Sequence, residues 1–281
     1  MKKLILCCLI SVVVFTSMMA EKTKNSGSAF SKINTSTRSA ALGTDKSAKV
    51  NYWIDSLYSS MNLNENGLSR SIFFTACKGY EYMLSQNKLN KQGILTICDY
   101  SQRSSKKRLY VLDLNQGKIL FNTYVAHGRN SGNEYATSFS NSTDSHKSSL
   151  GFMRTAETYF GDNGYSMRLD GMEYGFNNNV RSRAIVMHGS DYVNKERASD
   201  GIMMGRSYGC PAVPAAEVKK LINCIKDGSC FFNYYPDKKY AKSSKIVNAN
   251  FAWPVTQTLQ IASIKTPDTL AKITDAINSV N

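Results

Sequence analysis

Short strand-like segments recur along the chain from residue 94, and they constrain the fold more than any other feature of the sequence. The expected strands are residues 94–98, 109–114, 119–125, 166–169, 184–188 and 230–235, with a hairpin-like turn at Asn115, Gln116 and Gly117. Between the last two strands the apolar spacing predicts a helix, with Pro214 near its start and Gly228 at its end. The pattern therefore predicts a mainly β (α+β) domain with flanking helices.

The first twenty residues have the composition of an export signal. Lys2 and Lys3 precede an apolar run, residues 4–15, that is too short to span a bilayer comfortably, and Ala20 offers a cleavage site. A retained N-terminal anchor is the alternative. We expect residues 1–20 to be a signal peptide and the protein to be exported to the periplasm or cell envelope, or secreted. A membrane contact is expected only through an uncleaved signal.

The rest of the chain divides by composition into one main domain and its flanking segments. A chain of 281 residues, 42% of them hydrophobic, is sufficient for one sizeable core. Residues 21–49 are rich in Ser, Thr, Lys and Asn and predict a disordered linker. The remaining expected parts are a helical segment at 50–90, with helices near 52–60 and 67–85, the main domain at 91–236, and a tail at 237–281 with a weak helix at 270–280.

The chain is strongly basic, with a formal charge of +14 and a pI of about 9.4. Cleavage of the signal would remove two lysines and leave +12. Such a charge attracts polyanions in general, including nucleic acid, anionic lipid and the acidic bacterial wall. The sequence has no zinc-finger spacing, no aromatic ribonucleoprotein signature and no long Lys/Arg run, so no nucleic-acid partner is expected.

Five cysteines remain after the signal, namely Cys77, Cys98, Cys210, Cys224 and Cys230. In an oxidising compartment this odd number suits one working thiol with up to two disulfides among the other four. Buried free thiols are an equal alternative for Cys77 and Cys98. A local bond between Cys224 and Cys230 would leave Cys210 free.

Two short segments have the residue types of a nucleophilic site. Residues 185–189 (IVMHG) form a strand that runs into a turn, and residues 205–211 (GRSYGCP) form a tight loop that leads toward a helix. A cysteine near a helix start and an imidazole has its pKa lowered to about 3.5–7.5. The backbone N–H groups of Gly209 and Cys210 could form an oxyanion hole, worth about 3 to 4 kcal/mol per donor. A packed or disulfide-bonded Cys210 is the structural alternative.

Several linked motifs make the chain recognisable. They are RLYVLDL at 108–114, VAHGR at 125–129, SSLG at 148–151, RAIVMHG at 183–189 and GRSYGCPAV at 205–213. Over about residues 68–236 the chain resembles the YkuD-type L,D-transpeptidase catalytic domain, most closely its murein L,D-transpeptidase branch. The resemblance implies a β-sandwich or barrel-like fold, with Cys210 as nucleophile and His188 as general base. It implies no cofactor and no metal, and no close metal-ligand spacing is seen.

The resemblance also implies the reaction. Cys210 would attack the carbonyl of the third, diamino-acid residue of a peptidoglycan tetrapeptide stem, release D-Ala and form a thioester. An amine acceptor would give a 3-3 cross-link, and water would make the enzyme an L,D-carboxypeptidase. Two further hypotheses are a catalytically silent wall-binding protein and an unrelated Cys–His peptidase of the wall. Retention of both Cys210 and His188 weighs against a silent protein.

Further site residues follow from the same motifs. The resemblance implies that Gly209 and Cys210 donate to the oxyanion, and that Ser207 and Arg206 shape the loop or hold substrate. Tyr208 stands where the wider superfamily has a second histidine, so proton transfer depends on His188. Gly189 is expected near the substrate.

The polar loop at residues 129–149 and its flanking residues form a second group of candidates. The loop is too long for an ordinary turn and is expected to act as a substrate lid, with a solvated insertion as the alternative. His127, at a strand end, either lines the cleft or satisfies a turn. Arg129 is expected near the substrate, whereas His146 is expected in solvent.

Overall fold

A computed structural model describes residues 46–254, and the statements below concern that range. The expected signal peptide at 1–20, nearly all of the linker and the tail helix at 270–280 lie outside the described residues. Within residues 46–254, no helix combines the length and the apolar character needed to cross a membrane.

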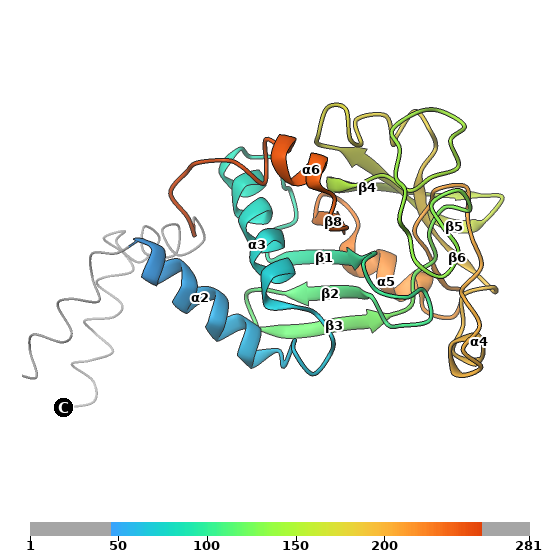
Figure 1. Cartoon of the computed structure of the whole chain (residues 1–281), viewed down its shortest axis with the longest axis horizontal. Coiled ribbons are helices and arrows are strands. Elements are labelled where there is room, and N and C mark those ends of the chain that lie inside the picture. Colours follow the sequence, from blue (N-terminus) through green and yellow to red (C-terminus); the bar gives the residue numbers. More distant parts are fainter. Residues whose placement is uncertain (1–45, 255–281) are drawn as a thin grey trace, which may run out of the picture. The chain divides into compact units, whose positions relative to one another are not determined.

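Eight strands form one mixed sheet in the order β3-β2-β1-β8-β4-β5-β6-β7 (Figure 1). The strands are β1 (Ile94–Asp99), β2 (Leu109–Asp113), β3 (Lys118–Thr123), β4 (Gly151–Gly161), β5 (Gly164–Gly171), β6 (Val186–Ser190), β7 (Ala212–Pro214) and β8 (Cys230–Tyr234). The pairs β1–β8 and β6–β7 are parallel, and the other pairs are antiparallel. The predicted mainly β fold class with flanking helices is confirmed.

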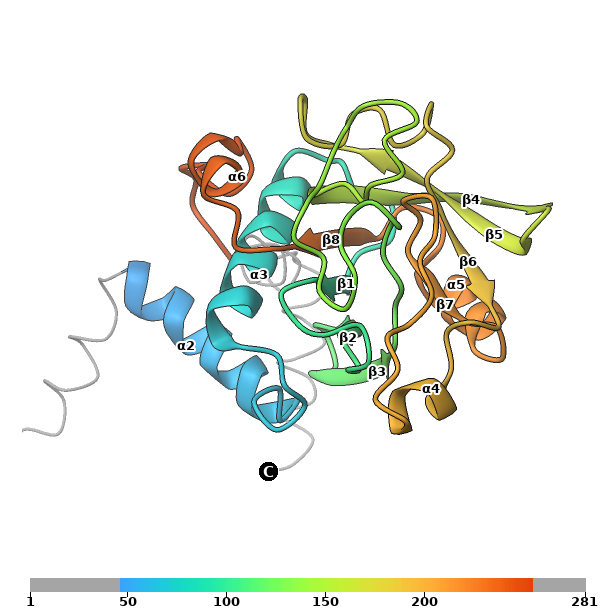
Figure 2. The same cartoon turned by 45° about the vertical axis from the view of Figure 1, so that its right-hand side comes forward.

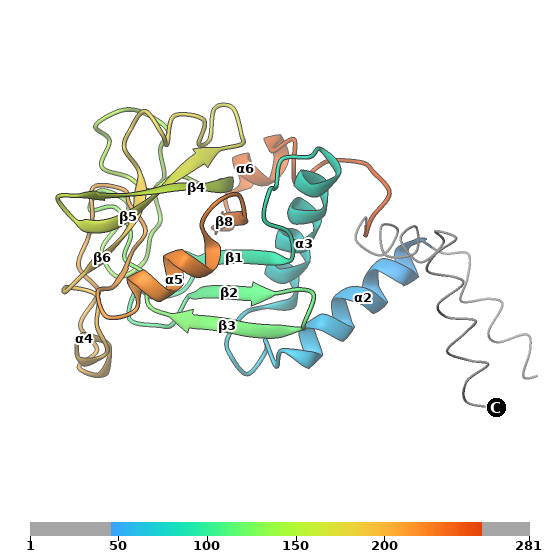
Figure 3. The same ribbon diagram turned by 180° about the vertical axis from the view of Figure 1, so that it is seen from behind.

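Helices cover both faces of this sheet, as Figures 1 and 3 show from opposite sides. Because neighbouring strand residues point to opposite faces, Phe232 of β8 packs in the core under α2 (Lys46–Ser60) and α3 (Arg70–Ser85). Phe231 packs in the core on the other face, with the buried side of α5 (Val218–Ile225). On this second face the sheet curves over its own core, because Val111 of β2 and Met187 of β6 belong to the same cluster as Phe231.

Two element boundaries differ from the sequence prediction. The helix α2 begins at Lys46, inside the predicted linker. Pro214 does not start a helix, because residues 212–214 pair with β6 as the short strand β7, and α5 begins only at Val218. Cys210 therefore precedes a strand rather than a helix N-terminus.

Residues beyond 236, predicted to be a tail, are part of the domain as far as residue 254. Helix α6 (Lys238–Ser243) brings the Tyr240 hydroxyl to within 2.7 Å of the Glu173 carboxylate, and the Ser244 hydroxyl donates to the same group. Glu173 is buried, and burial raises its pKa. Trp253 then packs edge-on against Trp53 of α2, with ring centroids 6.3 Å apart.

No disulfide joins the five cysteines in the described part of the chain. Cys77, Cys98 and Cys230 are buried thiols whose pKa values are raised by burial. This agrees with the alternative of free, packed thiols for Cys77 and Cys98, and it leaves Cys210 unpaired.

Candidate active site

Parallel pairing of β6 with β7 brings the two motif segments together. His188 lies opposite Ala212 in the register, and Cys210 comes two residues before Ala212. The backbone N–H of Val186 points at the Cys210 sulfur at 3.4 Å. Figure 2 shows β6 beside β7, at the edge of the sheet. Segments that are far apart in the sequence are thus adjacent through one strand pair.

The cysteine loop is shaped by the Ser207 side chain. Its hydroxyl donates to the Cys210 carbonyl at 2.6 Å and accepts the Gly209 N–H at 3.1 Å. Gly209 has a φ of +119°, and a Cβ there would lie 2.7 Å from the Lys147 carbonyl oxygen. Only glycine fits both the conformation and the space.

This arrangement corrects the expected oxyanion hole. The Gly209 N–H is already committed to Ser207, so it is not free to bind a developing oxyanion. Among the described residues, the Cys210 N–H has no hydrogen-bond acceptor. Of the expected pair, only Cys210 therefore offers an available backbone donor.

The protonation state of Cys210 also differs from expectation. Burial raises the pKa of its thiol, although the Val186 N–H and the Arg183 charge oppose this shift. The helix start that was expected to lower it lies at Val218, beyond β7. The resting site therefore favours a neutral thiol at neutral pH.

His188 is buried and has a defined tautomer. Burial lowers the pKa of its imidazole, which is therefore neutral near pH 7. Its Nδ1 lies 2.9 Å from the Gly189 carbonyl oxygen. Because a carbonyl oxygen only accepts, Nδ1 carries the proton and Nε2 is left as the basic nitrogen. The ring has the form that a general base requires.

A pocket of about 290 Å³ opens at Cys210. Its other lining residues come from the loop after β3, the β4–β5 turn and both motif segments: Asp144, His146, Asn163, Arg183, Ala184, Ile185 and Tyr208. The loop expected to be a lid contributes Asp144 and His146 to this lining. Residues 129–149 thus border the pocket, and their own side chains form part of its wall.

His146, which was expected in solvent, is a pocket residue. Its ring centroid lies 4.5 Å from that of Tyr208, tilted by 31°. The Arg129 guanidinium lies 4.8 Å from the same Tyr208 ring, which is 63% exposed. Tyr208 therefore stands at the pocket mouth in contact with two loop residues.

Arg183 is the second pocket residue to which the sequence assigned no role. Its guanidinium donates four hydrogen bonds to the loop, to the Ser140 and Lys147 carbonyl oxygens and the Ser145 and Ser149 hydroxyls, at 2.6–3.1 Å. Arg183 is the first residue of the RAIVMHG motif, and its place in that motif is the sequence feature that could have identified it. It fixes the loop and adds positive charge near the thiol.

His127 was expected either to line the cleft or to satisfy a turn, and it lies away from any accessible surface. It is 0% exposed, and Arg108 Nη2 lies 2.8 Å from its Nδ1. Because arginine only donates, Nδ1 accepts and Nε2 faces the Gly132 carbonyl oxygen at 3.4 Å. Burial and the Arg108 charge lower the pKa of His127 to about 3. These contacts fit the alternative in which the His127 side chain satisfies a turn.

Arg206 was expected to shape the loop or hold substrate, and Gly189 to lie near the substrate; both make structural contacts. Arg206 donates to the Arg129 carbonyl oxygen at 2.9 Å and to the Asn133 side chain at 3.0 Å. A Cβ on Gly189 would lie 2.9 Å from Val218 Cγ1, so this glycine makes room for the start of α5.

A metal site finds no support in the described residues, because none of their His, Cys, Asp and Glu side chains form a group of three or more suited to an ion.

Comparisons with known proteins agree with the motifs. A family model of the L,D-transpeptidase catalytic domain matches residues 64–234. No curated protein sequence matches significantly. Among solved structures, an L,D-transpeptidase from Mycobacterium smegmatis is 11% identical, with 51% of this chain and 59% of that chain covered and a TM-score of 0.32. The helical cell shape determining protein from Campylobacter jejuni is 16% identical, with 58% and 57% covered and a TM-score of 0.33. The chain thus spans less than two thirds of either protein.

Proposed function

This chain belongs to the L,D-transpeptidase catalytic domain family, and from that membership we propose that it is an exported cysteine enzyme acting on peptidoglycan stem peptides. The observation that best supports the proposal is the strand pairing that sets the His188 strand beside the Cys210 loop at an open pocket. The basic charge of the chain suits an acidic wall polymer.

In the proposed reaction, His188 Nε2 takes the thiol proton as the Cys210 sulfur bonds to the carbonyl carbon of the third stem residue. The Cys210 N–H donates to the oxygen on which charge develops. The C–N bond to the terminal D-Ala breaks, and its amine leaves with the proton held by His188. The product is a thioester on Cys210, and His188 is neutral again.

The second half-reaction resolves the thioester. An amine on another stem, deprotonated by His188, attacks the thioester carbonyl and forms a 3-3 cross-link, which returns the thiol. Water in the same position would give an L,D-carboxypeptidase. We favour the amine because the chain belongs to the L,D-transpeptidase family.

Two side chains at the pocket are proposed to hold the donor stem. Asp144 and His146 of the loop line the space that the stem would occupy, while Arg183 holds that loop in place through its four hydrogen bonds. Tyr208 stands where the wider superfamily has a second histidine, and His146 is the one imidazole that lines this pocket among the described residues. His188 does not line it and is placed near Cys210 by the β6–β7 pairing.

The test uses purified protein and defined disaccharide-tetrapeptide, with intact-protein mass spectrometry under denaturing conditions. We expect a covalent adduct that is absent from Cys210→Ala, and cross-linked dimers among the released products. Disaccharide-pentapeptide should give no adduct. In the tetrapeptide the bond after the diamino acid releases a single terminal D-Ala, whereas in the pentapeptide an additional residue would have to fit in the place of that leaving group. Monomeric tripeptide products alone would identify the carboxypeptidase. Binding to wall sacculi without adduct or product would support a silent binding protein.

A further inference from the structure

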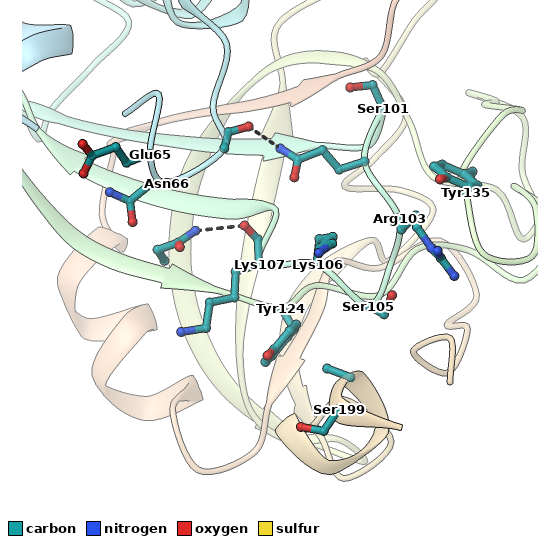
Figure 4. Close-up of a pocket in the computed structure, with 14 residues that line it drawn as sticks. Glu65, Asn66, Ser101, Arg103, Ser105, Lys106, Lys107, Tyr124, Tyr135 and Ser199 are labelled. Atoms are coloured by element: carbon teal, nitrogen blue, oxygen red, sulfur yellow. Dashed lines mark hydrogen bonds between the residues drawn. The ribbon is translucent and has the colours of Figure 1, made fainter. Parts of the chain in front are cut away.

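A second and larger pocket, of about 880 Å³, contains neither Cys210 nor His188 (Figure 4). Three chain segments form most of its wall, residues 65–67, 101–107 and 122–124. Tyr135 of the 129–149 loop and the end of α4 (Lys195–Ser199) complete it. The mechanism proposed above uses none of these residues.

Hydrogen bonds between the wall segments form this pocket without any ligand. The Gln102 side chain donates to the Gly67 carbonyl oxygen at 3.0 Å, and the Asn122 side chain donates to the Lys107 carbonyl oxygen at 2.9 Å (Figure 4). The Tyr110 hydroxyl donates to the Asn66 carbonyl oxygen at 2.8 Å. A ligand would therefore enter a preorganised site, which lowers the entropic cost of binding.

The charge of the lining favours an anion. Arg103 is paired with Glu134, but Lys106 and Lys107 are exposed and have no acidic partner within residues 46–254. Glu65 is the one acidic residue among those lining the pocket. Tyr124 and Tyr135 add hydroxyl groups and ring faces, whereas Ala198 is the one aliphatic side chain in the lining. The chemistry suits a polar chain with carboxylates and does not suit a lipid.

The 129–149 loop connects this pocket to Cys210. Tyr135 lines the larger pocket, and His146 lines the pocket at the thiol. Arg206, in the cysteine motif segment, donates to Asn133 of the 129–149 loop. The 129–149 loop therefore borders both pockets.

We propose that the larger pocket binds a second, unreacted peptidoglycan stem through its free carboxylates. This proposal rests on the proposed function, because that function supplies the polymer. Phosphate groups of other wall polymers have the same charge chemistry, so the experiment includes them as a separate ligand.

The test measures binding of a soluble tetrapeptide stem to the full chain by calorimetric titration, in the Cys210→Ala background that cannot react. The pocket variant is Lys106→Gln with Lys107→Gln. The matched control is Lys219→Gln with Lys220→Gln, an exposed lysine pair on α5 that removes the same charge. We expect two stems bound per chain in the background and in the control. The pocket variant should bind one, or bind the second about tenfold or more weakly.

Three outcomes would overturn the proposal. The first is that the Cys210→Ala protein binds only one stem per chain. The second is that the pocket variant and the control variant lose the same amount of stem affinity. The third is that Lys106 and Lys107 are needed for binding a glycerol phosphate oligomer but not for binding the stem. A stem with amidated carboxylates should lose the second binding event. Thioester formation by the unmodified protein is measured in parallel. Its absence alongside Lys106- and Lys107-dependent stem binding would count against the proposed enzyme and not against the pocket.

Discussion

At the residue scale, burial sets the protonation states of Cys210 and His188, the two side chains proposed to react. The pKa of Cys210 is raised and that of His188 is lowered, mainly because each charged form would lose hydration. Near pH 7 the pair is therefore a thiol and a neutral imidazole rather than an ion pair. In the proposed reaction, the proton must therefore pass from Cys210 to His188 as the substrate reacts.

Alkylation of Cys210 by iodoacetamide should report this state. We expect the rate to increase steadily with pH from 7 to above 9, because the thiolate forms only as the pH approaches the raised pKa. The Cys210→Ala protein gives the background from the other thiols, of which Cys224 is partly exposed. A rate that is already constant between pH 6 and 8 would instead show a stable thiolate–imidazolium pair.

Loss of the proposed base, His188, should lower activity far more than loss of the His146 imidazole in the loop. We expect His188→Gln to lower turnover by about 10²- to 10⁴-fold, the usual contribution of general-base catalysis. His146→Gln should raise KM more than it lowers kcat, since this side chain only lines the pocket. Steady-state kinetics on disaccharide-tetrapeptide separates the two. A greater loss of kcat in His146→Gln than in His188→Gln would reverse the assignment.

Two substitutions of Tyr208 distinguish the contribution of its hydroxyl to activity from that of its ring. Tyr208→Phe keeps the ring contacts with His146 and Arg129, so we expect a modest loss of activity. Tyr208→Ala removes both contacts and should be several times worse. The ratio of kcat/KM for the two variants is the measurement. If Phe were as damaging as Ala, the hydroxyl would have a direct part in proton transfer.

At the element scale, the cysteine loop depends on a backbone conformation that only glycine adopts easily. Gly209→Ala should lower the free energy of unfolding by about 1–3 kcal/mol and abolish thioester formation, because a Cβ would meet the Lys147 carbonyl oxygen. Gly175→Ala is the control, since Gly175 also has a positive φ but open space around it. Urea unfolding and adduct formation are measured on both. Equal effects would mean that φ strain, and not the close approach, constrains the loop.

Elements whose stability is local could be predicted from the sequence, and those that depend on distant partners could not. The predicted strands at 94–98 and 109–114 match β1 and β2 closely, because their apolar residues are continuous. The longest strand, β4, was missed: its buried Thr155 is polar and is satisfied by the Ile225 carbonyl oxygen, 70 residues away. The three residues of β7 form a strand only through β6.

The candidate site residues also fall into those that the sequence indicates and those that only the folded structure reveals. Cys210, His188 and Ser207 carry motif signals, and strand pairing brings their segments together. His146 could not be predicted, because it reaches the pocket through loop contacts that leave no pattern in the sequence. The commitment of the Gly209 N–H to Ser207 is likewise a three-dimensional fact.

At the scale of the whole molecule, His127 should make stability depend on pH. Its pKa is lowered to about 3 in the folded protein, against about 6.5 in an unfolded chain. Between these values the unfolded chain binds a proton that the folded protein does not. The contribution of neutral His127 to the free energy of unfolding is therefore complete above about pH 6.5 and is lost as the pH falls toward 3. The urea midpoint should decrease between pH 7 and pH 4.

The control for this prediction is His127→Gln, which keeps an acceptor for Arg108 but does not titrate in this range. Its urea midpoint should be lower at pH 7 and should change less between pH 7 and pH 4. Glu173, whose pKa is raised by burial, acts in the opposite direction, since its contribution is lost as the pH rises. An unchanged pH dependence in His127→Gln would assign the effect to other groups.

The packing of Trp253 on Trp53 has a mechanical consequence. Because these residues lie near residues 254 and 46, the chain enters and leaves the described domain at one place, beside α2. Trp53 and Trp253 pack against the α2 and α3 core, on the opposite face of the sheet from α5, whereas Cys210 lies beside β6 and β7. A pull on either flanking segment is therefore applied through α2 and not at the strands beside Cys210. For the proposed function this means that the domain can be held by its chain ends while the strands beside Cys210 stay open to the wall polymer.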